Sequence, residues 1–329
     1  MNATKLDASV LELDLAAEAD RIARWMIDTL VNKLHRRGVV VSMSGGIDSS
    51  VCAALAVHAL GPSKVFGLLQ PERDSSSFSL ERGRQLAEHL GIEYRVHDIA
   101  PALEALGCYA QRDEAIRRVF ADYGPGWKNK IVIAGGTQRG INFFKLVVQS
   151  PDGGLHEARL PVREYLQIVA ATNFKQRVRK TMDYFHADRL NYAVVGTPNR
   201  LEYDQGFFVK NGDGAADLKP IAHLYKTQVY AMARHLKLPD ELCNAVPTTD
   251  TYTLAQGQDE FYFALPYQQM DIALWARNHD CSAAELGEAL GIGEHAAALV
   301  YRDIDAKRHA TRYLLAAPER VEAPDEGTR

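Results

Sequence analysis

The stretch that decides the fold reads Ser44-Gly45-Gly46-Ile47-Asp48-Ser49-Ser50 and lies between two apolar runs, at 38–41 and 51–60. The first run is short and rich in valine, which predicts a strand over 38–43, and the second predicts a helix over 49–60. Glycines in a tight loop between a strand and a helix let successive backbone N–H groups point at one spot, where the helix dipole adds positive potential. The loop and its serine hydroxyls therefore predict a binding site for a pyrophosphate.

Asp48 gives this loop a second property, because its carboxylate would repel a bare phosphate. We expect Asp48 to hold a Mg²⁺ ion that the phosphates share. The loop is not a Walker loop, since the spacing G-x-x-x-x-G-K-[ST] is absent and no lysine ends it. An ordinary Ser/Gly turn that opens a helix is the alternative interpretation of the same residues.

Strands and helices alternate on both sides of the loop. This alternation predicts an α/β fold with a doubly wound parallel sheet, in which ligands bind at the carboxyl ends of the strands. The Ser/Gly loop lies at such an end, so the sheet and the loop predict the same place for a ligand. The predicted strands lie at 65–69, 94–99 and 192–195, and the predicted helices at 11–35, 80–90, 173–187 and 224–236.

Residues 101–165 interrupt the alternation. Apolar runs at 142–149 and 155–160 flank Ser150-Pro151-Asp152-Gly153-Gly154, a combination that predicts an inserted β-hairpin. Two interpretations of this hairpin stay open. It is either a lid or flap beside a site, or an inert surface insertion.

The composition is that of an ordinary soluble globular protein, with 47% hydrophobic residues and a net charge of −4. This charge argues against a general nucleic-acid partner, and no apolar stretch is long enough to cross a membrane. The N-terminus lacks a secretory pattern, and separated cysteines without a CxxC pair favour a reducing cytoplasm over a zinc or disulfide framework. We expect a single domain over 1–315 and a disordered polar tail at 316–329. The cysteines are Cys52, Cys108, Cys243 and Cys281.

A second dense group of polar residues follows the last predicted strand. Glu202 is placed to meet Asp48 across the same Mg²⁺ ion, and Lys210 and Lys226 are placed to neutralise phosphate charge in a transition state. A solvated loop is the alternative for any single one of these residues. The group comprises Thr197, Asn199, Arg200, Glu202, Lys210, Asp213, Asp217, Lys219 and Lys226.

The Ser/Gly loop resembles the SGGxDS signature of the PP-loop ATP pyrophosphatases, which cleave ATP between its α and β phosphates and adenylate a carboxylate or a carbonyl-type oxygen. Further motifs are similar to those of the NAD synthetase family and appear in that family's order. By this resemblance, over roughly 20–100 and 165–310, the chain is identified as a member of the ammonia-dependent type. The motifs are NxxAR(x)R at 173–179, GTxNRxE at 195–202, GxFTKxGDGxxDxxP at 206–220, LxKTxV at 224–229 and GQxDE at 256–260.

The resemblance implies an adenine nucleotide alpha-hydrolase-like fold and a ligase that converts nicotinic acid adenine dinucleotide to NAD through an acyl-adenylate, releasing AMP and pyrophosphate. It also implies ATP as co-substrate, Mg²⁺, a homodimer, and ammonia that is either free or supplied by a separate glutaminase partner. It places the ATP site on Ser42, Ser44, Gly45, Gly46, Asp48, Ser49, Thr197, Lys226 and Thr248, with catalytic roles for Asp48, Lys226 and Thr248, Mg²⁺ ligands at Asp48 and Glu202, and the acid site at Arg177, Lys210, Asp217 and Lys307.

Three departures from the family pattern concern the acid rather than ATP. Val209 replaces a threonine, Ala306 replaces a histidine, and the hairpin region is longer than in compact members. A related PP-loop ligase that amidates a different carboxylic acid therefore stays open as the alternative. A tRNA-modifying PP-loop enzyme would bring an RNA-binding module or catalytic cysteines, and neither is evident in the sequence. A nucleotide sensor without catalytic activity is disfavoured by the retained Asp48, Glu202 and Lys226.

Overall fold

A parallel sheet of four strands lies at the centre of the computed structural model, which describes the whole chain except residues 1–5, 135–142, 245–251, 255–261, 264 and 322–329. The order β3-β2-β1-β7 places β1 between β2 and β7, so the chain reverses its direction of winding at β1. Ligands of open α/β sheets bind at this switch point. The strands are β1 (Val39–Ser42), β2 (Val65–Leu69), β3 (Glu93–Val96) and β7 (Ala193–Val195).

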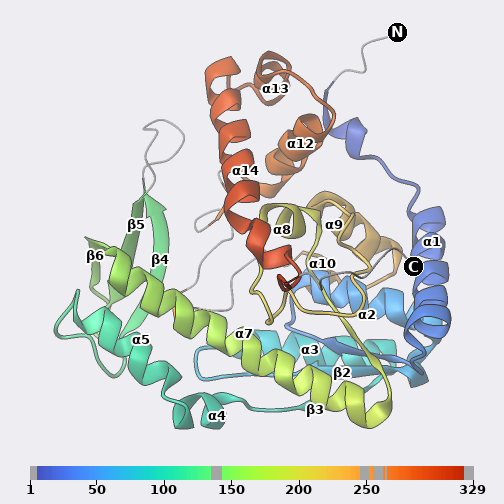
Figure 1. Cartoon of the computed structure of the whole chain (residues 1–329), viewed down its shortest axis with the longest axis horizontal. Helices are drawn as coiled ribbons and strands as arrows, with labels where there is room; N and C mark the ends of the chain where they lie inside the picture. Colours follow the sequence, from blue (N-terminus) through green and yellow to red (C-terminus); the bar gives the residue numbers. More distant parts are fainter. Residues whose placement is uncertain (1–5, 135–142, 245–251, 255–261, 264, 322–329) are drawn as a thin grey trace.

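Helices cover both faces of this sheet, which confirms the doubly wound α/β fold (Figure 1). Side chains alternate along each strand, so Val39 and Val41 of β1 pack into the core of one face and Val40 packs into the core of the other. On the first face lie α1 (Leu15–Asp28), α2 (Ile47–Leu60), α3 (Ser77–Leu90) and α9 (Lys226–His235), and on the second lies α7 (Val162–Leu190).

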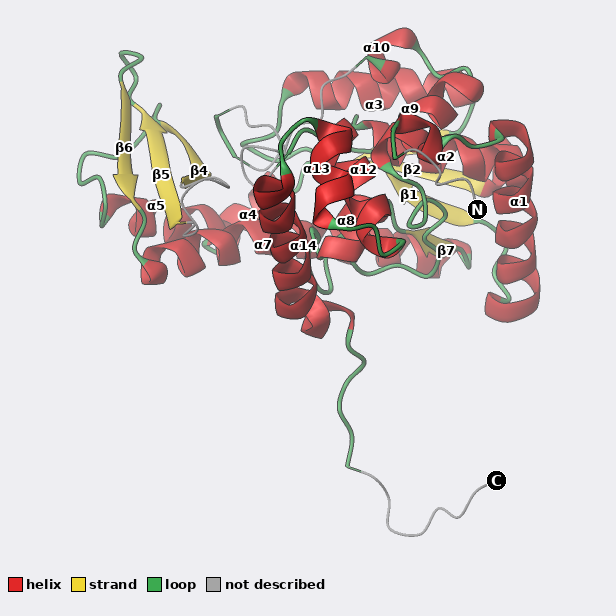
Figure 2. Ribbon diagram, turned by 90° about the horizontal axis from the view of Figure 1, so that it is seen from above, coloured by secondary structure: helices red, strands yellow, loops and turns green. Residues whose placement is uncertain are grey.

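The inserted region contains the predicted hairpin and one strand more. After α4 (Ala100–Ala105) and α5 (Cys108–Arg117), the strands β5 (Phe143–Gln149) and β6 (Leu155–Arg159) pair around the predicted turn. The third strand, β4 (Lys128–Ala134), pairs with the other edge of β5 and makes a three-stranded antiparallel sheet. Figure 2 shows this sheet at one end of the molecule, away from β1 and β2.

The second half of the chain is mainly helical. A short helix, α8 (Arg200–Gln205), is followed by residues 206–220, which are largely turns. After α10 (Asp240–Cys243), the helices α12 (Tyr267–Asn278), α13 (Ala283–Leu290) and α14 (Glu294–Leu315) share a core of their own. Of the helices that the structure describes, none has the length and apolar character needed to cross a membrane. The shorter helices are η1 (Ala8–Leu11), η2 (Thr29–Leu34) and η3 (Pro62–Lys64).

Candidate functional site

A cavity of about 770 Å³ opens at the carboxyl end of β1. It lies where the switch point of the sheet predicts a ligand, and α7, α8 and α14 contribute to its walls. Residues of the Ser/Gly loop and of the second polar group line it together, as do Ser42 and Lys307. From the two groups these are Ser44, Gly45, Gly46, Asp48, Ser49, Thr197, Glu202, Asp213 and Lys226.

The backbone of the Ser/Gly loop requires glycine at its first turn. Gly45 has a φ of +75°, and a Cβ atom there would lie 2.5 Å from the backbone oxygen of Ser79. The hydroxyl of Ser49 donates to the carbonyl of Gly46 at 2.9 Å and accepts from the backbone N–H of Ser44 at 3.3 Å. The serine side chains therefore shape the loop and its helix N-terminus, in addition to offering donors to a ligand.

Two carboxylates from distant parts of the chain are held together by Asn199. Its side-chain N–H donates to Asp48 Oδ1 at 2.9 Å, and its backbone N–H donates to Glu202 Oε2 at 3.2 Å. The Glu202 contact is half of a capping box that begins α8, because Asn199 Oδ1 also accepts the Glu202 N–H at 3.2 Å. Local helix capping therefore orients Glu202, and the same asparagine connects it to Asp48.

Lys226 supplies a buried positive charge beside these carboxylates. Its Nζ pairs with Asp48 Oδ2, and only 2% of the residue is exposed. Burial lowers the pKa of Lys226, but the charges of Asp48 and Glu202 outweigh burial and raise it above its ordinary value. Lys226 is therefore protonated at neutral pH and presents a cation to the cavity.

Asp271, which was not predicted as a site residue, fixes the position of Lys226. Its two carboxylate oxygens accept the backbone N–H groups of Lys226 at 3.1 Å and Thr227 at 2.7 Å, so it caps the start of α9. Burial raises the pKa of Asp271 to about 6, although these hydrogen bonds oppose the shift. No local spacing links Asp271 to Lys226, because 45 residues separate them.

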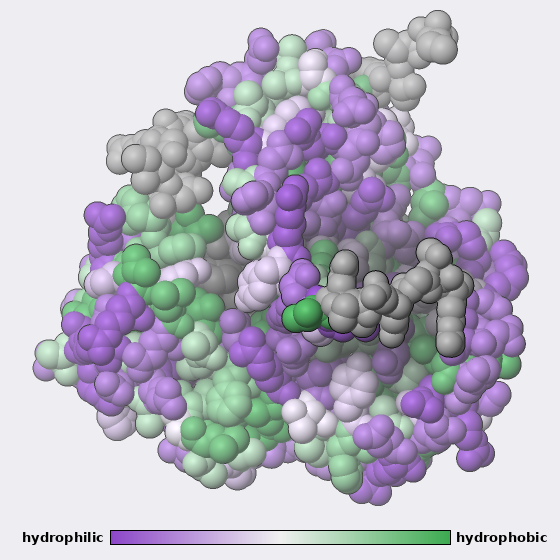
Figure 3. Space-filling view, in the orientation of Figure 1, coloured by the Kyte–Doolittle hydropathy of each residue, from purple (hydrophilic) through white to green (hydrophobic). Residues whose placement is uncertain are grey.

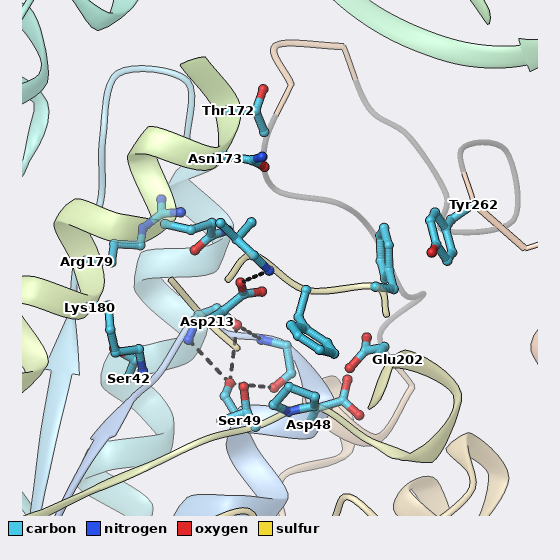
Figure 4. Close-up of a pocket in the computed structure, with 18 of the residues that line it drawn as sticks. Ser42, Asp48, Ser49, Thr172, Asn173, Arg179, Lys180, Glu202, Asp213 and Tyr262 are labelled. Carbon is cyan, nitrogen blue, oxygen red and sulfur yellow. Dashed lines mark hydrogen bonds between the residues drawn. The ribbon is translucent and has the colours of Figure 1, made fainter. Parts of the chain in front are cut away.

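On the opposite wall of the cavity, α7 contacts Ser42 at the carboxyl end of β1, just before the Ser/Gly loop. Ser42 Oγ donates to Asp183 Oδ1 at 2.6 Å, and Lys180 Nζ pairs with Asp183 Oδ2 at 2.8 Å. Arg179 Nε donates to the carbonyl of Gln70 at 3.2 Å. Figure 4 shows Arg179, Lys180 and Ser42 on one side of the pocket and Asp48 and Glu202 on the other. Neither Arg179 nor Lys180 was predicted as a site residue, although helical spacing from Gln176 places both near the cavity-lining face of α7.

Of the residues expected to face the acid, Lys307 lines the cavity. Its Nζ donates to Asp303 Oδ2 and to the carbonyl of Tyr262, both at 2.5 Å. Burial lowers the pKa of Lys307, while Asp303 acts in the opposite direction. This lysine is therefore positioned by α14 to meet a ligand from the side that faces α8.

The other three residues expected at the acid site do not line the cavity. Arg177 is exposed and donates to the backbone carbonyl of Lys210 at 3.2 Å, and Lys210 Nζ donates to the backbone carbonyl of Tyr313 at 2.7 Å. Asp217 accepts a backbone N–H of β7 at 2.7 Å. Their contact with the acid stays a prediction, and Thr248 lies outside the described residues.

The oxygen donors of Asp48 and Glu202 fit a Mg²⁺ ion. Mg²⁺ prefers carboxylate oxygens and keeps most of its coordination for water and substrate phosphates. Asp48 and Glu202 are joined through Asn199 at the edge of the cavity, next to the Ser/Gly loop. Across the described residues no group of three or more His, Cys, Asp or Glu is placed to hold a metal ion.

The family model for NAD synthase matches residues 19–122 and 144–313, which is most of the chain. The chain belongs to the NAD synthase family. It is 55% identical over 326 residues to the NH(3)-dependent NAD(+) synthetase of Rhizobium meliloti strain 1021, covering 99% of this chain and 97% of that relative. The NH(3)-dependent NAD(+) synthetase of Thermotoga maritima is 36% identical over 256 residues, covering 77% of this chain and 85% of that relative.

Solved structures confirm the fold of this family member. The NH3-dependent NAD synthetase of Campylobacter jejuni superposes with a TM-score of 0.62 at 20% identity, covering 94% of this chain and all of that chain. The NMN synthetase of Francisella tularensis superposes with a TM-score of 0.65 at 21% identity, covering 95% of this chain and all of that chain. At these identities the likeness establishes the fold alone.

Proposed function

We propose that this chain is an ammonia-dependent NAD synthetase, a ligase that uses ATP to convert the carboxylate of nicotinic acid adenine dinucleotide into the amide of NAD. The observation that carries the proposal is the 55% identity to the Rhizobium meliloti enzyme of that name over nearly the full length of both chains. The site supports it independently, because a phosphate-binding loop, two carboxylates and a buried lysine line one cavity.

In the first step the carboxylate oxygen of the acid attacks the α-phosphorus of ATP, and the bond to the β-phosphate oxygen breaks. The departing pyrophosphate is bound by the N–H groups of the Ser/Gly loop and the start of α2. Lys226 is protonated and stabilises the charge that grows on the phosphates. When bound by Asp48 and Glu202, Mg²⁺ supplies further neutralisation of phosphate charge.

In the second step ammonia attacks the acyl carbon of the adenylate. AMP leaves with the electron pair of the acyl–oxygen bond, and the nitrogen loses a proton to become the amide. The contribution of the protein is mainly to hold the acyl group, AMP and ammonia together, because adenylation has already made the carboxylate reactive. The ammonia is free or comes from a separate glutaminase partner.

The experiment that tests this function measures NAD, AMP and pyrophosphate from purified protein, ATP, Mg²⁺ and the dinucleotide acid. We expect ammonium to support turnover, and we expect glutamine alone to fail when free ammonia is scavenged. Rapid turnover with glutamine under scavenging would contradict the proposed donor. If no NAD forms but another carboxylic acid supports ATP–pyrophosphate exchange, the enzyme is the alternative PP-loop amide ligase.

The proposal includes a homodimer in the cytoplasm. Val162, Leu166 and Phe185 of α7 are 74%, 58% and 57% exposed, and a second subunit would cover such apolar side chains. Figure 3 shows further hydrophobic residues gathered over α4, α5 and α7 on this face. The described cysteines are free thiols, as a reducing compartment keeps them. Light scattering of the purified chain measures the mass that decides between monomer and dimer.

A further inference from the structure

One face of α7 lines the cavity along most of the helix. Tyr165, Val169, Asn173, Gln176, Lys180 and Asp183 all line it and recur every three or four residues, which is the spacing of a single helical face. At a rise of 1.5 Å per residue, the 18 residue steps from Tyr165 to Asp183 span about 27 Å. The cavity is therefore elongated, and it continues well beyond the Ser/Gly loop.

The chemistry of this face changes along its length. Asp183 and Lys180 are charged and lie at the Ser/Gly loop, where Asp183 accepts the hydroxyl of Ser42 at 2.6 Å. Uncharged polar residues follow, and Figure 4 shows two of them, Thr172 and Asn173, farther along the same helix. Val169 and Tyr165 make the far end apolar. A ligand that fits this wall is charged at one end and carries an uncharged, flat group at the other.

The inserted sheet closes the apolar end. Ile133 of β4 and Phe144 of β5 are direct partners in the antiparallel register, so their side chains share one face of the sheet. Both residues line the cavity. The ring of Phe144 stacks on Tyr165 of α7 with centroids 4.2 Å apart and planes 16° apart. Two packed aromatic rings beside an aliphatic side chain form the kind of surface on which a planar heterocycle stacks.

We propose that this far end, formed by Ile133, Phe144 and Tyr165, binds the adenine ring of the dinucleotide acid, so that the inserted sheet selects a dinucleotide over a mononucleotide. The inference rests on the proposed function. Ile133 of β4 lies within residues 123–143, which the family model does not match, whereas Phe144 and Tyr165 lie within the matched residues 144–313.

The reach of the two substrates favours the dinucleotide acid over ATP as the occupant. The phosphates of ATP lie on the Ser/Gly loop, and a single ribose separates its base from the α-phosphate. The acid has to bring its carboxylate to that same phosphate, and two riboses and a pyrophosphate then separate its pyridine ring from its adenine. Only the adenine of the acid therefore extends toward the far end of an elongated cavity.

The test compares three dissociation constants, for the dinucleotide acid, for nicotinic acid mononucleotide and for ATP, in the wild type and in Phe144→Ala. We expect the variant to bind the dinucleotide acid roughly ten-fold more weakly, because one stacked ring is lost. Binding of ATP and of the mononucleotide is expected to stay within about two-fold. Phe144→Leu, which keeps apolar volume without a ring, should weaken binding of the dinucleotide acid as Phe144→Ala does. Phe144→Trp, which keeps an aromatic ring, should bind the dinucleotide acid about as tightly as the wild type.

Phe143→Ala is the matched control. Phe143 precedes Phe144 on β5, points to the opposite face of the sheet, lies over Arg159 and does not line the cavity. Its loss is expected to leave all three constants unchanged. If Phe144→Ala fails to fold, Ile133→Ala tests the same wall with a smaller side chain.

Three results overturn the proposal, namely an unchanged constant for the dinucleotide acid, an equal weakening of all three ligands, or a weakening of ATP alone. Failure of the proposed function is a different result, because the wild type would then make no NAD from the acid.

Discussion

The two ends of α7 pack against regions of different construction. Its C-terminal half covers the parallel sheet, where Ala187 packs with Val40 and Val194. Its N-terminal half covers the antiparallel sheet, where Ile168 packs with Ile131 and Leu146. In the region of the parallel sheet, strands lead directly into polar loops and helices, so the reactive groups belong to short contiguous motifs. In the region of the antiparallel sheet, the wall of the cavity arises from contacts between segments far apart in sequence.

The variant with the largest expected effect disrupts only the end of the cavity at the Ser/Gly loop. Asp48→Asn removes one of the two carboxylates that fit Mg²⁺ and the partner of Lys226, so we expect kcat to fall by about 1,000-fold. Steady-state assays at ordinary magnesium measure this loss. Asp152→Asn, in the turn between β5 and β6, serves as the control and is expected to keep full activity. Wild-type turnover by Asp48→Asn would disprove the assignment of this carboxylate.

The comparison explains what could be predicted from the sequence. The parallel strands and the positions of Asp48 and Glu202 could be predicted because strand, loop and helix follow one another within a few residues. The strand β4 could not, since its pairing with β5 is a contact made only in the folded chain. Asp271 was missed for the same reason, because it acts through backbone N–H groups of a helix that no local pattern connects to it.

A buried ion network connects the two regions, and breaking it is expected to have the next largest effect. Lys175 of α7 is 1% exposed, and its Nζ pairs with Glu72 at 2.9 Å and with Asp74 at 2.6 Å, both in the loop after β2. Arg112 of α5, from the inserted region, also pairs with Asp74. Burial raises the pKa of Asp74, but Lys175 and Arg112 outweigh it and lower the pKa below its ordinary value.

Lys175→Met removes the only described cation that pairs with both buried carboxylates, although Arg112 and Arg73 still pair with Asp74. We therefore expect the free energy of unfolding to fall by about 3–5 kcal/mol. Lys145→Met is the control, because Lys145 pairs with the exposed Glu157 at 2.7 Å, and such surface pairs contribute less than about 1 kcal/mol. Urea unfolding at neutral pH measures both variants. Equal losses in the two variants would show that the network does not stabilise the junction between the regions.

The smallest expected effect is a pH dependence of folding stability that arises from Asp271, beside Lys226. Burial raises the pKa of Asp271 to about 6 in the folded protein, whereas an aspartate in an unfolded chain titrates near 3.9. Between these values the folded protein holds a proton that the unfolded chain has lost, so stability falls as pH rises from about 4 to about 6. Through this group the wild type therefore loses up to about 3 kcal/mol across that window.

The asparagine side chain of Asp271→Asn does not titrate in this range. The free energy of unfolding of the variant should therefore not fall in the same way as pH rises. We expect the difference in unfolding free energy between wild type and variant to change by up to about 3 kcal/mol from pH 4 to pH 7, in favour of the variant at the higher pH. The constant cost of placing an amide beside the N–H groups of Lys226 and Thr227 cancels when two pH values are compared. Denaturant titrations at both pH values measure the change. Parallel stability curves would mean that Asp271 stays ionised in the fold and that hydrogen bonding to the start of α9, rather than burial, controls its charge.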